Sequence, residues 1–335
     1  MGEQKKTNKA SLLSEIAYMY YIEGLSQNDI AEKMFISRSR ISRLLYEAKS
    51  EGIVEINIKF VSDRNYQLEE FLKNTMGLKD ARVYNDVGRN AEETFNGVCN
   101  FAAEYFISRI KPKMCVGLTH GMLFSKIADI IERDYPPQKL DLNMVQLIGH
   151  HSSPQAGTTA PDVMSRIVRH YGGSIHCLNA PIYIENDSLK AGLLREPLIN
   201  ETLDVAHSID MALIGVKAIN SSAQMKKQVI WAGYVKDETL DELISLGTCG
   251  HILGRAIDVD GNQINHFINR CIIGLELSYL SKVKEVICIA TGAERGPVVS
   301  GATNGKYINV LITDRSCAQQ VMELYFQKKH KETHN

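Results

Sequence analysis

Residues 26–52 read SQNDIAEKMFISRSRISRLLYEAKSEG, and this segment decides the fold of the amino-terminal part of the chain. Ser26 followed by Asp29 is typical of a helix N-cap with an acidic partner three residues later, and Ser37 is the predicted N-cap of a second helix. Apolar residues then recur at helical spacing, first as Ile30, Ala31 and Met34 and then as Ile41, Leu44, Leu45 and Ala48. Two short amphipathic helices joined by a tight turn predict a helix-turn-helix.

The outer face of the second helix carries cations and hydroxyl groups. Between Lys33 and Lys49, five basic residues stand against one acidic residue. A helix fits the major groove of B-DNA, where arginine can bind guanine or phosphate and serine can bind either. An ordinary helical hairpin with a solvated face is the alternative. We expect DNA contacts from the residues of this face, which are Ser37, Arg38, Ser39, Arg40, Ser42 and Arg43.

Phe35 is unusual at the turn between these helices. Many helix-turn-helix sequences have glycine at this position, where a positive φ is energetically cheap. Phenylalanine there predicts either a different turn or local strain.

The composition favours a two-domain cytoplasmic protein. The chain has 335 residues, 44% of them hydrophobic, and 38 basic residues against 39 acidic ones. With a net charge of −1, contact with DNA must be local. The seven cysteines form no CxxC pair, so neither a zinc ribbon nor a disulfide framework is expected. There is no secretory signal and no run of about 18 apolar residues, so we expect no membrane partner.

The rest of the first domain follows from local pattern. The polar residues 1–10 are expected to fray, and a helix is predicted over Ser11–Glu23. Ile53–Phe60 alternates apolar and polar residues, which predicts a strand that serves as a wing or short hairpin. Residues 1–60 are therefore interpreted as a winged helix-turn-helix domain.

A linker and a larger domain follow. Residues 61–78 contain a predicted helix, Asn65–Met76, whose apolar face can pack on the second domain or on a partner subunit. Residues 79–335 alternate short apolar strands with helices, which predicts an α/β, Rossmann-like domain with a parallel sheet covered on both faces. The predicted strands are Ala81–Tyr84, Met114–Leu118, Leu142–Ile148, Ser174–Leu178, Met211–Val216, Glu285–Ala290 and Ile308–Thr313, and the predicted helices are Ala91–Arg109, Gly121–Tyr135, Asp162–Tyr171 and Arg315–Lys328.

Seven segments in the same order resemble the SorC family of bacterial sugar-responsive transcriptional regulators, over nearly the whole chain. The first is the DNA-binding segment Tyr20–Leu45. The others are VGLTHGMLF (116–124), VQLIGH (145–150), LNAPIYIENDSLKAGLLREP (178–197), IDMALIGV (209–216), GHILGRAIDVDGN (250–262) and ATGAERGPVVSGATNGKYINVLITD (290–314).

This resemblance implies a winged helix-turn-helix plus an effector domain similar in fold to sugar-phosphate isomerases and deaminases. Family effectors are sugars, sugar phosphates or polyols, and family members are usually tetramers. We accordingly expect a homotetramer or homodimer that binds operator DNA and a small sugar-type molecule, with no cofactor and no metal.

Two glycine-containing loops are the candidate effector site. Thr119, His120 and Gly121 precede a predicted helix, whose N-terminus favours an anion, and Thr291, Gly292 and Arg295 form a second such loop. The sequence departs from the family pattern at four positions that the resemblance assigns to the ligand pocket: Arg295 replaces a lysine, His251 replaces an aspartate, and His120 and His150 replace other residues. These three histidines and His151, all in predicted strand-end loops, can bind sugar hydroxyls, confer pH sensitivity or bind a metal.

Two classes of function remain to be compared. A ligand-controlled transcription factor explains the basic helix and the α/β domain together. A sugar-phosphate isomerase or deaminase with an appended DNA-binding domain needs a general base, and the histidines are the only candidates beside the glycine loops. A constitutive architectural DNA-binding protein conflicts with the net charge. We therefore expect a non-enzymatic regulator of a carbohydrate or polyol operon.

Overall fold

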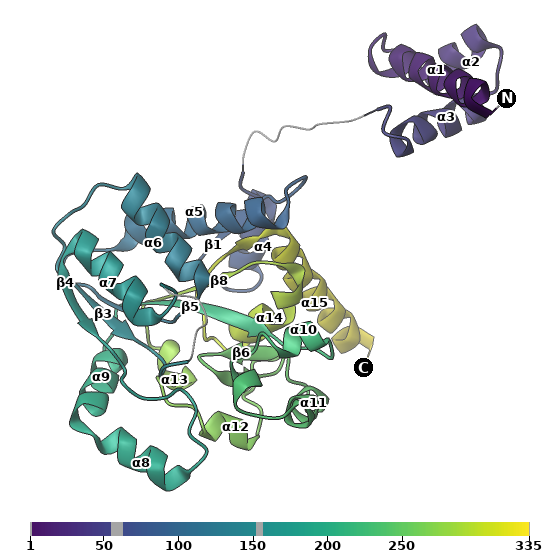
Figure 1. The fold of residues 1–335 in the computed structure, drawn as a ribbon. Coiled ribbons are helices and arrows are strands. Elements are labelled where there is room, and N and C mark those ends of the chain that lie inside the picture. Colours follow the sequence, from purple (N-terminus) through teal and green to yellow (C-terminus); the bar gives the residue numbers. More distant parts are fainter. Residues whose placement is uncertain (1, 55–62, 152–156, 335) are drawn as a thin grey trace. The chain divides into compact units, whose positions relative to one another are not determined.

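The computed structural model describes residues 2–54, 63–151 and 157–334. The chain divides into two compact units, residues 1–61 and residues 62–335 (Figure 1). The first unit is helical and the second is a mixed α/β structure built on a parallel sheet.

The first unit is a three-helix cluster. Its helices are α1 (Gly2–Tyr21), α2 (Gln27–Met34) and α3 (Arg38–Ser50). The expected fraying of residues 1–10 is wrong for the described residues, because α1 already begins at Gly2; the segment is rich in lysine, glutamine and glutamate, which are good helix formers. The predicted wing strand falls mainly on residues 55–60, which lie outside the described residues. The buried core residues are Leu13, Ile16, Ala17, Met19, Ile30, Ile41, Leu45 and Ala48.

The caps of α2 and α3 are formed as the sequence predicts. The Ser26 hydroxyl accepts a hydrogen bond from the Asp29 N–H at 3.3 Å, and the Asp29 carboxylate accepts one from the Ser26 N–H at 3.0 Å. Phe35 adopts a left-handed conformation (φ 54°, ψ 38°) and its side chain is 94% exposed. The turn therefore keeps the geometry that glycine usually provides, and Phe35 bears the strain.

The second unit is built on seven parallel strands. Their order across the sheet is β1-β9-β8-β5-β2-β3-β4. Two short strands, β6 (Gly250–Ile252) and β7 (Arg255–Ile257), continue from β5 in antiparallel fashion. The parallel strands are β1 (Asp80–Tyr84), β2 (Cys115–Leu118), β3 (Leu142–Gln146), β4 (Gly173–His176), β5 (Met211–Ala218), β8 (Glu285–Ala290) and β9 (Val310–Asp314).

Helices cover both faces of this sheet. One face packs against α5 (Ala91–Arg109), α6 (Met122–Asp134) and α7 (Ala160–Tyr171). The other packs against α4 (Tyr66–Asn74), α9 (Pro197–His207), α14 (Gly296–Asn304) and α15 (Arg315–His334). The remaining helices are α8 (Asp187–Arg195), α10 (Ala223–Lys226), η1 (Ile230–Gly233), α11 (Asp237–Ser245), α12 (Phe267–Arg270), α13 (Leu277–Leu280) and η2 (Ala293–Arg295). Within the described residues, no helix is both long and apolar enough to cross a membrane.

Strand β5 shows why helices must pack on both faces of the sheet. Leu213 belongs to the core under α5, α6 and α7, whereas Ala212 and Ile214 belong to the core on the opposite face. Because successive side chains of a strand point to opposite faces, a continuous apolar strand is buried on both sides.

Helix α4 is part of the second unit. Leu68 and Leu72 are buried in its core. The buried Glu69 carboxylate accepts hydrogen bonds from the Val83 N–H at 3.0 Å and from the Arg64 guanidinium. These contacts fix α4 against β1 of the same chain.

Candidate functional site

A cavity of about 410 Å³ opens at the carboxyl ends of β2, β5 and β8. In the sheet, β2 and β5 are neighbours. The next parallel strand of the chain after β2 is β3, which lies on the side of β2 away from β5, and the next one after β5 is β8, which lies on the side of β5 away from β2. The direction in which successive strands are added therefore reverses between β2 and β5. Parallel α/β sheets bind ligands at such a point. The cavity is lined by Phe95, Thr119, His120, Gly121, Met122, Leu123, Phe124, Ile148, His151, Thr158, Gly215, Val216, Lys217, Gln228, Ile230, His251, Leu253, Gly254, Ile289, Ala290, Thr291 and Arg295.

The N-terminus of α6 faces this cavity. Its N-cap is Gly121, which has φ 133° and provides no side-chain cap. The Gly121 N–H is already bonded to the Thr158 carbonyl at 2.9 Å, and space is open beside its Cα. The N–H groups of the first helical residues, Met122 and Leu123, have no acceptor within the helix. This end of the cavity therefore favours an anion.

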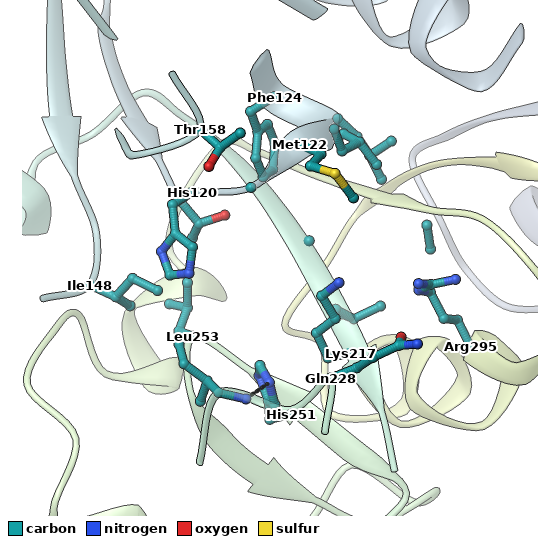
Figure 2. Close-up of a pocket in the computed structure, with 18 of the residues that line it drawn as sticks. His120, Met122, Phe124, Ile148, Thr158, Lys217, Gln228, His251, Leu253 and Arg295 are labelled. Carbon is teal, nitrogen blue, oxygen red and sulfur yellow. Dashed lines mark hydrogen bonds between the residues drawn. The ribbon is translucent and has the colours of Figure 1, made fainter. Parts of the chain in front are cut away.

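Two cationic side chains enter the cavity from neighbouring strand ends. Lys217 comes from the end of β5 and Arg295 from η2 (Figure 2). The Lys217 side chain is in contact with solvent through the open cavity. Partial desolvation by the surrounding protein, followed by the nearby charge of Arg295, nevertheless lowers its pKa. Arg295 donates hydrogen bonds to the Thr291 carbonyl and, at 2.6 Å, to the Glu294 carboxylate.

His251 lies opposite Lys217 in the antiparallel pair of β5 and β6. Its Nε2 accepts a hydrogen bond from the Ile230 N–H at 3.3 Å (Figure 2), so the neutral ring carries its proton on Nδ1. Nδ1 is buried and has no hydrogen-bond partner among the described residues. Burial, followed by the charge of Lys217 and by the neighbouring His120 and His151, lowers the pKa of His251 to about 3.

The imidazole rings of His120 and His151 stack on each other. Their ring centroids are 5.7 Å apart and the rings are nearly parallel. Burial lowers the pKa of His120 to about 4, with further lowering by His151, Lys217 and His150. Burial also lowers the pKa of His151. At neutral pH these rings are uncharged and can exchange hydrogen bonds with hydroxyl groups.

The charge of the cavity lining is one-sided. Among the described residues that line it there is no aspartate or glutamate, whereas Lys217 and Arg295 are both cations. In the described parts of the chain, no group of three or more His, Cys, Asp or Glu residues is arranged to hold a metal ion. The arrangement therefore suits an anionic ligand whose remaining atoms meet neutral polar and apolar side chains.

The structure brings together six of the eight predicted effector residues. Thr119, His120, Gly121, His251, Thr291 and Arg295 line the cavity.

The other two predicted residues, His150 and Gly292, do not line it. The backbone of His150 pairs with Ala180 and Ile182, and along an extended chain the next side chain, His151, takes the side of the cavity. The Gly292 N–H is bonded to the Asp314 carboxylate at 2.6 Å.

Sequence reasoning missed three polar residues of the cavity, which are Thr158, Lys217 and Gln228. Lys217 directly follows the apolar strand segment 209–216, and a lysine at the carboxyl end of a buried strand was the available signal. Gln228 belongs to a segment without a clear pattern before η1, so no signal in the sequence could have identified it.

The predicted DNA-binding face of α3 is exposed. Ser37 is the N-cap and its hydroxyl accepts a hydrogen bond from the Arg40 N–H at 3.4 Å. In the part of the chain that the structure describes, no ion pair involves Arg38, Arg40 or Arg43. The exposed residues of this face are Ser37, Arg38, Ser39, Arg40, Ser42 and Arg43.

Comparisons with known proteins show which proteins this chain resembles. Residues 62–323 match the family described as "Putative sugar-binding domain". The sorbitol operon regulator of Klebsiella pneumoniae is 25% identical over 93% of this chain and 98% of its own length. The deoxyribonucleoside regulator of Bacillus subtilis is 27% identical over 94% of this chain and 98% of its own.

Solved structures give the same result. The full-length sorbitol operon regulator SorC from Klebsiella pneumoniae superposes with a TM-score of 0.68 at 25% identity, covering 94% of this chain and 99% of that one. A transcriptional regulator from Streptococcus pneumoniae shares the fold, with a TM-score of 0.71 at 21% identity over 77% of this chain and 96% of that one.

A helix-turn-helix unit joined to a sugar-binding domain defines a ligand-responsive transcriptional regulator. The chain belongs to the SorC family of these regulators. The family description and the names of these regulators support a ligand-responsive regulator of a sugar operon, with DNA and a sugar-type molecule as its ligands.

Proposed function

We propose that the effector is a phosphorylated sugar or polyol whose phosphate is bound by Lys217, Arg295 and the N-terminus of α6. The observation that carries this proposal is the presence of two cations and an uncapped helix N-terminus in one cavity that no described carboxylate lines. Phosphate accepts several charge-assisted hydrogen bonds, and arginine can bind it through two parallel N–H groups.

The carbon skeleton of the effector then meets the neutral polar groups. Thr119, His120 and His251 are suited to hydrogen bonds with hydroxyl groups, since both imidazoles are held uncharged. Gly121 gives the ligand close access to the backbone, and Thr291 closes the side next to Arg295. Sugar hydroxyls both donate and accept, so they match this mixture of groups.

Operator recognition is assigned to α3. The exposed arginines Arg38, Arg40 and Arg43 are free to reach base edges and phosphates, and Ser37, Ser39 and Ser42 add shorter contacts. One helix-turn-helix reads few base pairs, so the proposal includes a homodimer or homotetramer that binds two half-sites. Effector binding changes operator affinity by favouring one arrangement of that oligomer.

The cavity is proposed to sense its ligand without converting it. Isomerisation or deamination needs a general acid and base near the substrate, and since no described aspartate or glutamate lines the cavity, His120, His151 and His251 are the candidates that it offers. Incubation with the binding compound, followed by NMR, should return that compound unchanged. Appearance of an isomer or of ammonia would support the enzymatic alternative.

The experiment that tests the effector class is a thermal-shift screen of neutral sugars, polyols and their monophosphates. A ligand at 100 times its dissociation constant stabilises its protein by about 2.7 kcal/mol. Phosphates should stabilise the protein and their neutral counterparts should not. Lys217→Met should remove the shift, whereas the matched variant Lys139→Met, at an exposed lysine outside the cavity, should keep it. Equal shifts with neutral sugars would overturn the proposal.

A further inference from the structure

Arg295 has an anionic partner within the chain. Its Nη1 atom donates to the Glu294 carboxylate at 2.6 Å and also to the Thr291 carbonyl. The Arg295 side chain is 18% exposed, whereas that of Glu294 is 42% exposed. The ion pair therefore lies at the edge of the cavity, with its carboxylate on the solvent side.

A second contact fixes the position of the same carboxylate. It lies against Gly292, where an added Cβ would overlap both carboxylate oxygens of Glu294. Gly292 has φ 93°, a conformation that glycine adopts without strain, and its N–H is held by the Asp314 carboxylate. The absence of a side chain at this position is what allows the Glu294 carboxylate to fold back over the loop toward Arg295.

Glu294 also acts on the other cation of the cavity. Burial and the Arg295 charge lower the pKa of Lys217, and the Glu294 charge opposes them. Glu294 is therefore close enough to influence both cations that face the effector, although it does not line the cavity itself. A carboxylate in this position competes with any anion that approaches Arg295.

We propose that Glu294 is an internal competitor for the effector's phosphate and determines which anions the cavity accepts. This inference rests on the proposed phosphate site. The Glu294 carboxylate is paired with the Arg295 guanidinium, and phosphate must displace it to bind that guanidinium. A phosphate group carries a charge of about −1.5 to −2 and three acceptor oxygens, so it replaces the lost ion pair with a stronger one. A monocarboxylate ligand would replace the Arg295–Glu294 ion pair with one of similar strength, and a neutral sugar would replace it with none.

Two substitutions separate displacement from simple charge repulsion. Glu294→Gln keeps the size of the side chain and removes its charge. Glu294→Asp keeps the charge but is one methylene shorter, which withdraws the carboxylate from Arg295 and Gly292. Glu201→Gln, at an exposed glutamate on α9, is the matched control, because it removes one negative charge from the same unit away from the cavity.

The measurement is isothermal titration of the full chain with inorganic phosphate, at constant ionic strength. Exposed ion pairs contribute up to about 1 kcal/mol, so Glu294→Gln should bind phosphate about 2- to 5-fold more tightly than the native protein. Glu294→Asp should also bind more tightly, and Glu201→Gln should be unchanged. Acetate should compete with phosphate in Glu294→Gln at concentrations that have no effect on the native protein.

The outcomes distinguish this inference from the phosphate site itself. If the native protein binds phosphate, Arg295→Ala loses that binding and Glu294→Gln matches the native protein, Glu294 is not a competitor and the phosphate site stands. If Glu294→Asp matches the native protein while Glu294→Gln binds more tightly, the effect is charge repulsion and displacement is overturned. If the native protein and all variants fail to bind phosphate, both proposals fall.

Discussion

The cations of the recognition helix and those of the cavity have contrasting surroundings. Arg38, Arg40 and Arg43 stand on an exposed helix face, and none has an ion pair in the described parts of the chain. Lys217 and Arg295 project into a cavity, and Arg295 is already held by Glu294. The first arrangement suits a long, repetitive polyanion that is bound through many screened contacts. The second suits one small anion bound through a few oriented contacts.

The largest expected effect comes from removing both cavity cations. In Lys217→Met/Arg295→Ala the phosphate loses both of its charged partners, each worth about 1.5–3 kcal/mol for hydrogen bonds to charged groups. The double variant should lose the whole ligand-induced thermal shift with the best phosphorylated compound of the screen. Lys139→Met is the control. A full thermal shift in the double variant would show that Lys217 and Arg295 do not bind the phosphate, so that the two sets of cations would no longer differ in this respect.

The next effect concerns the recognition helix. Arg38→Ala, Arg40→Ala and Arg43→Ala should each weaken operator binding, by roughly 1–3 kcal/mol where the arginine reads a base. Loss of a phosphate contact should weaken binding to all sequences and reduce its salt dependence. Fluorescence anisotropy at several salt concentrations separates these cases. Unchanged affinity in all three folded variants would exclude this helix from the interface.

A smaller effect concerns pH. The pKa of His120 and of His251 is lowered to about 4 and about 3, so the unfolded chain binds protons near pH 6.5 while the folded chain does not. The contribution to stability is complete above pH 6.5 and is lost as the pH falls toward 4, by up to about 1.4 kcal/mol per pH unit for each imidazole. Urea unfolding can be followed by the fluorescence of Trp231, the only tryptophan.

His251→Gln provides the control for this pH dependence. Glutamine can accept the hydrogen bond from the Ile230 N–H but does not titrate, so the variant should lose part of the slope between pH 6.5 and 4. Identical slopes in the native protein and the variant would show that His251 does not contribute.

The smallest effect tests the strain at the turn. Phe35 has a left-handed backbone and a fully solvated ring, so Phe35→Gly should raise the free energy of unfolding of the helical unit by about 0.5–1 kcal/mol. Phe35→Ala removes the ring but keeps Cβ, and it should bring no such gain. Chemical unfolding followed by circular dichroism measures both variants, and a loss of stability in Phe35→Gly would mean that the ring stabilises the unit.

Local signals in the sequence predicted most of the framework. The N-caps Ser26 and Ser37 and the helix Ala91–Arg109 are found as predicted, because capping and helical periodicity depend on residues close in sequence. The parallel sheet also follows from apolar strands that alternate with helices. The two glycine loops were predicted beside strand ends, and in the structure both contribute residues to one cavity.

The rest depends on contacts between distant segments. Lys217 faces the cavity and meets His251 because β6 pairs with β5, and this pairing joins residues that are far apart in sequence. His151 lines the cavity in place of the predicted His150, because the backbone of His150 pairs with residues 180–182 and this pairing sets which side chain faces the cavity. Glu294 covers Gly292 through a side-chain conformation that no periodicity encodes.

The most direct test of the account is operator affinity measured with and without the best phosphorylated compound, in the native protein and in Lys217→Met/Arg295→Ala. The account predicts that the compound changes operator affinity in the native protein. The double variant should bind the operator with the native affinity and should not respond to the compound. A double variant that responds like the native protein would contradict the assignment of this cavity as the effector site.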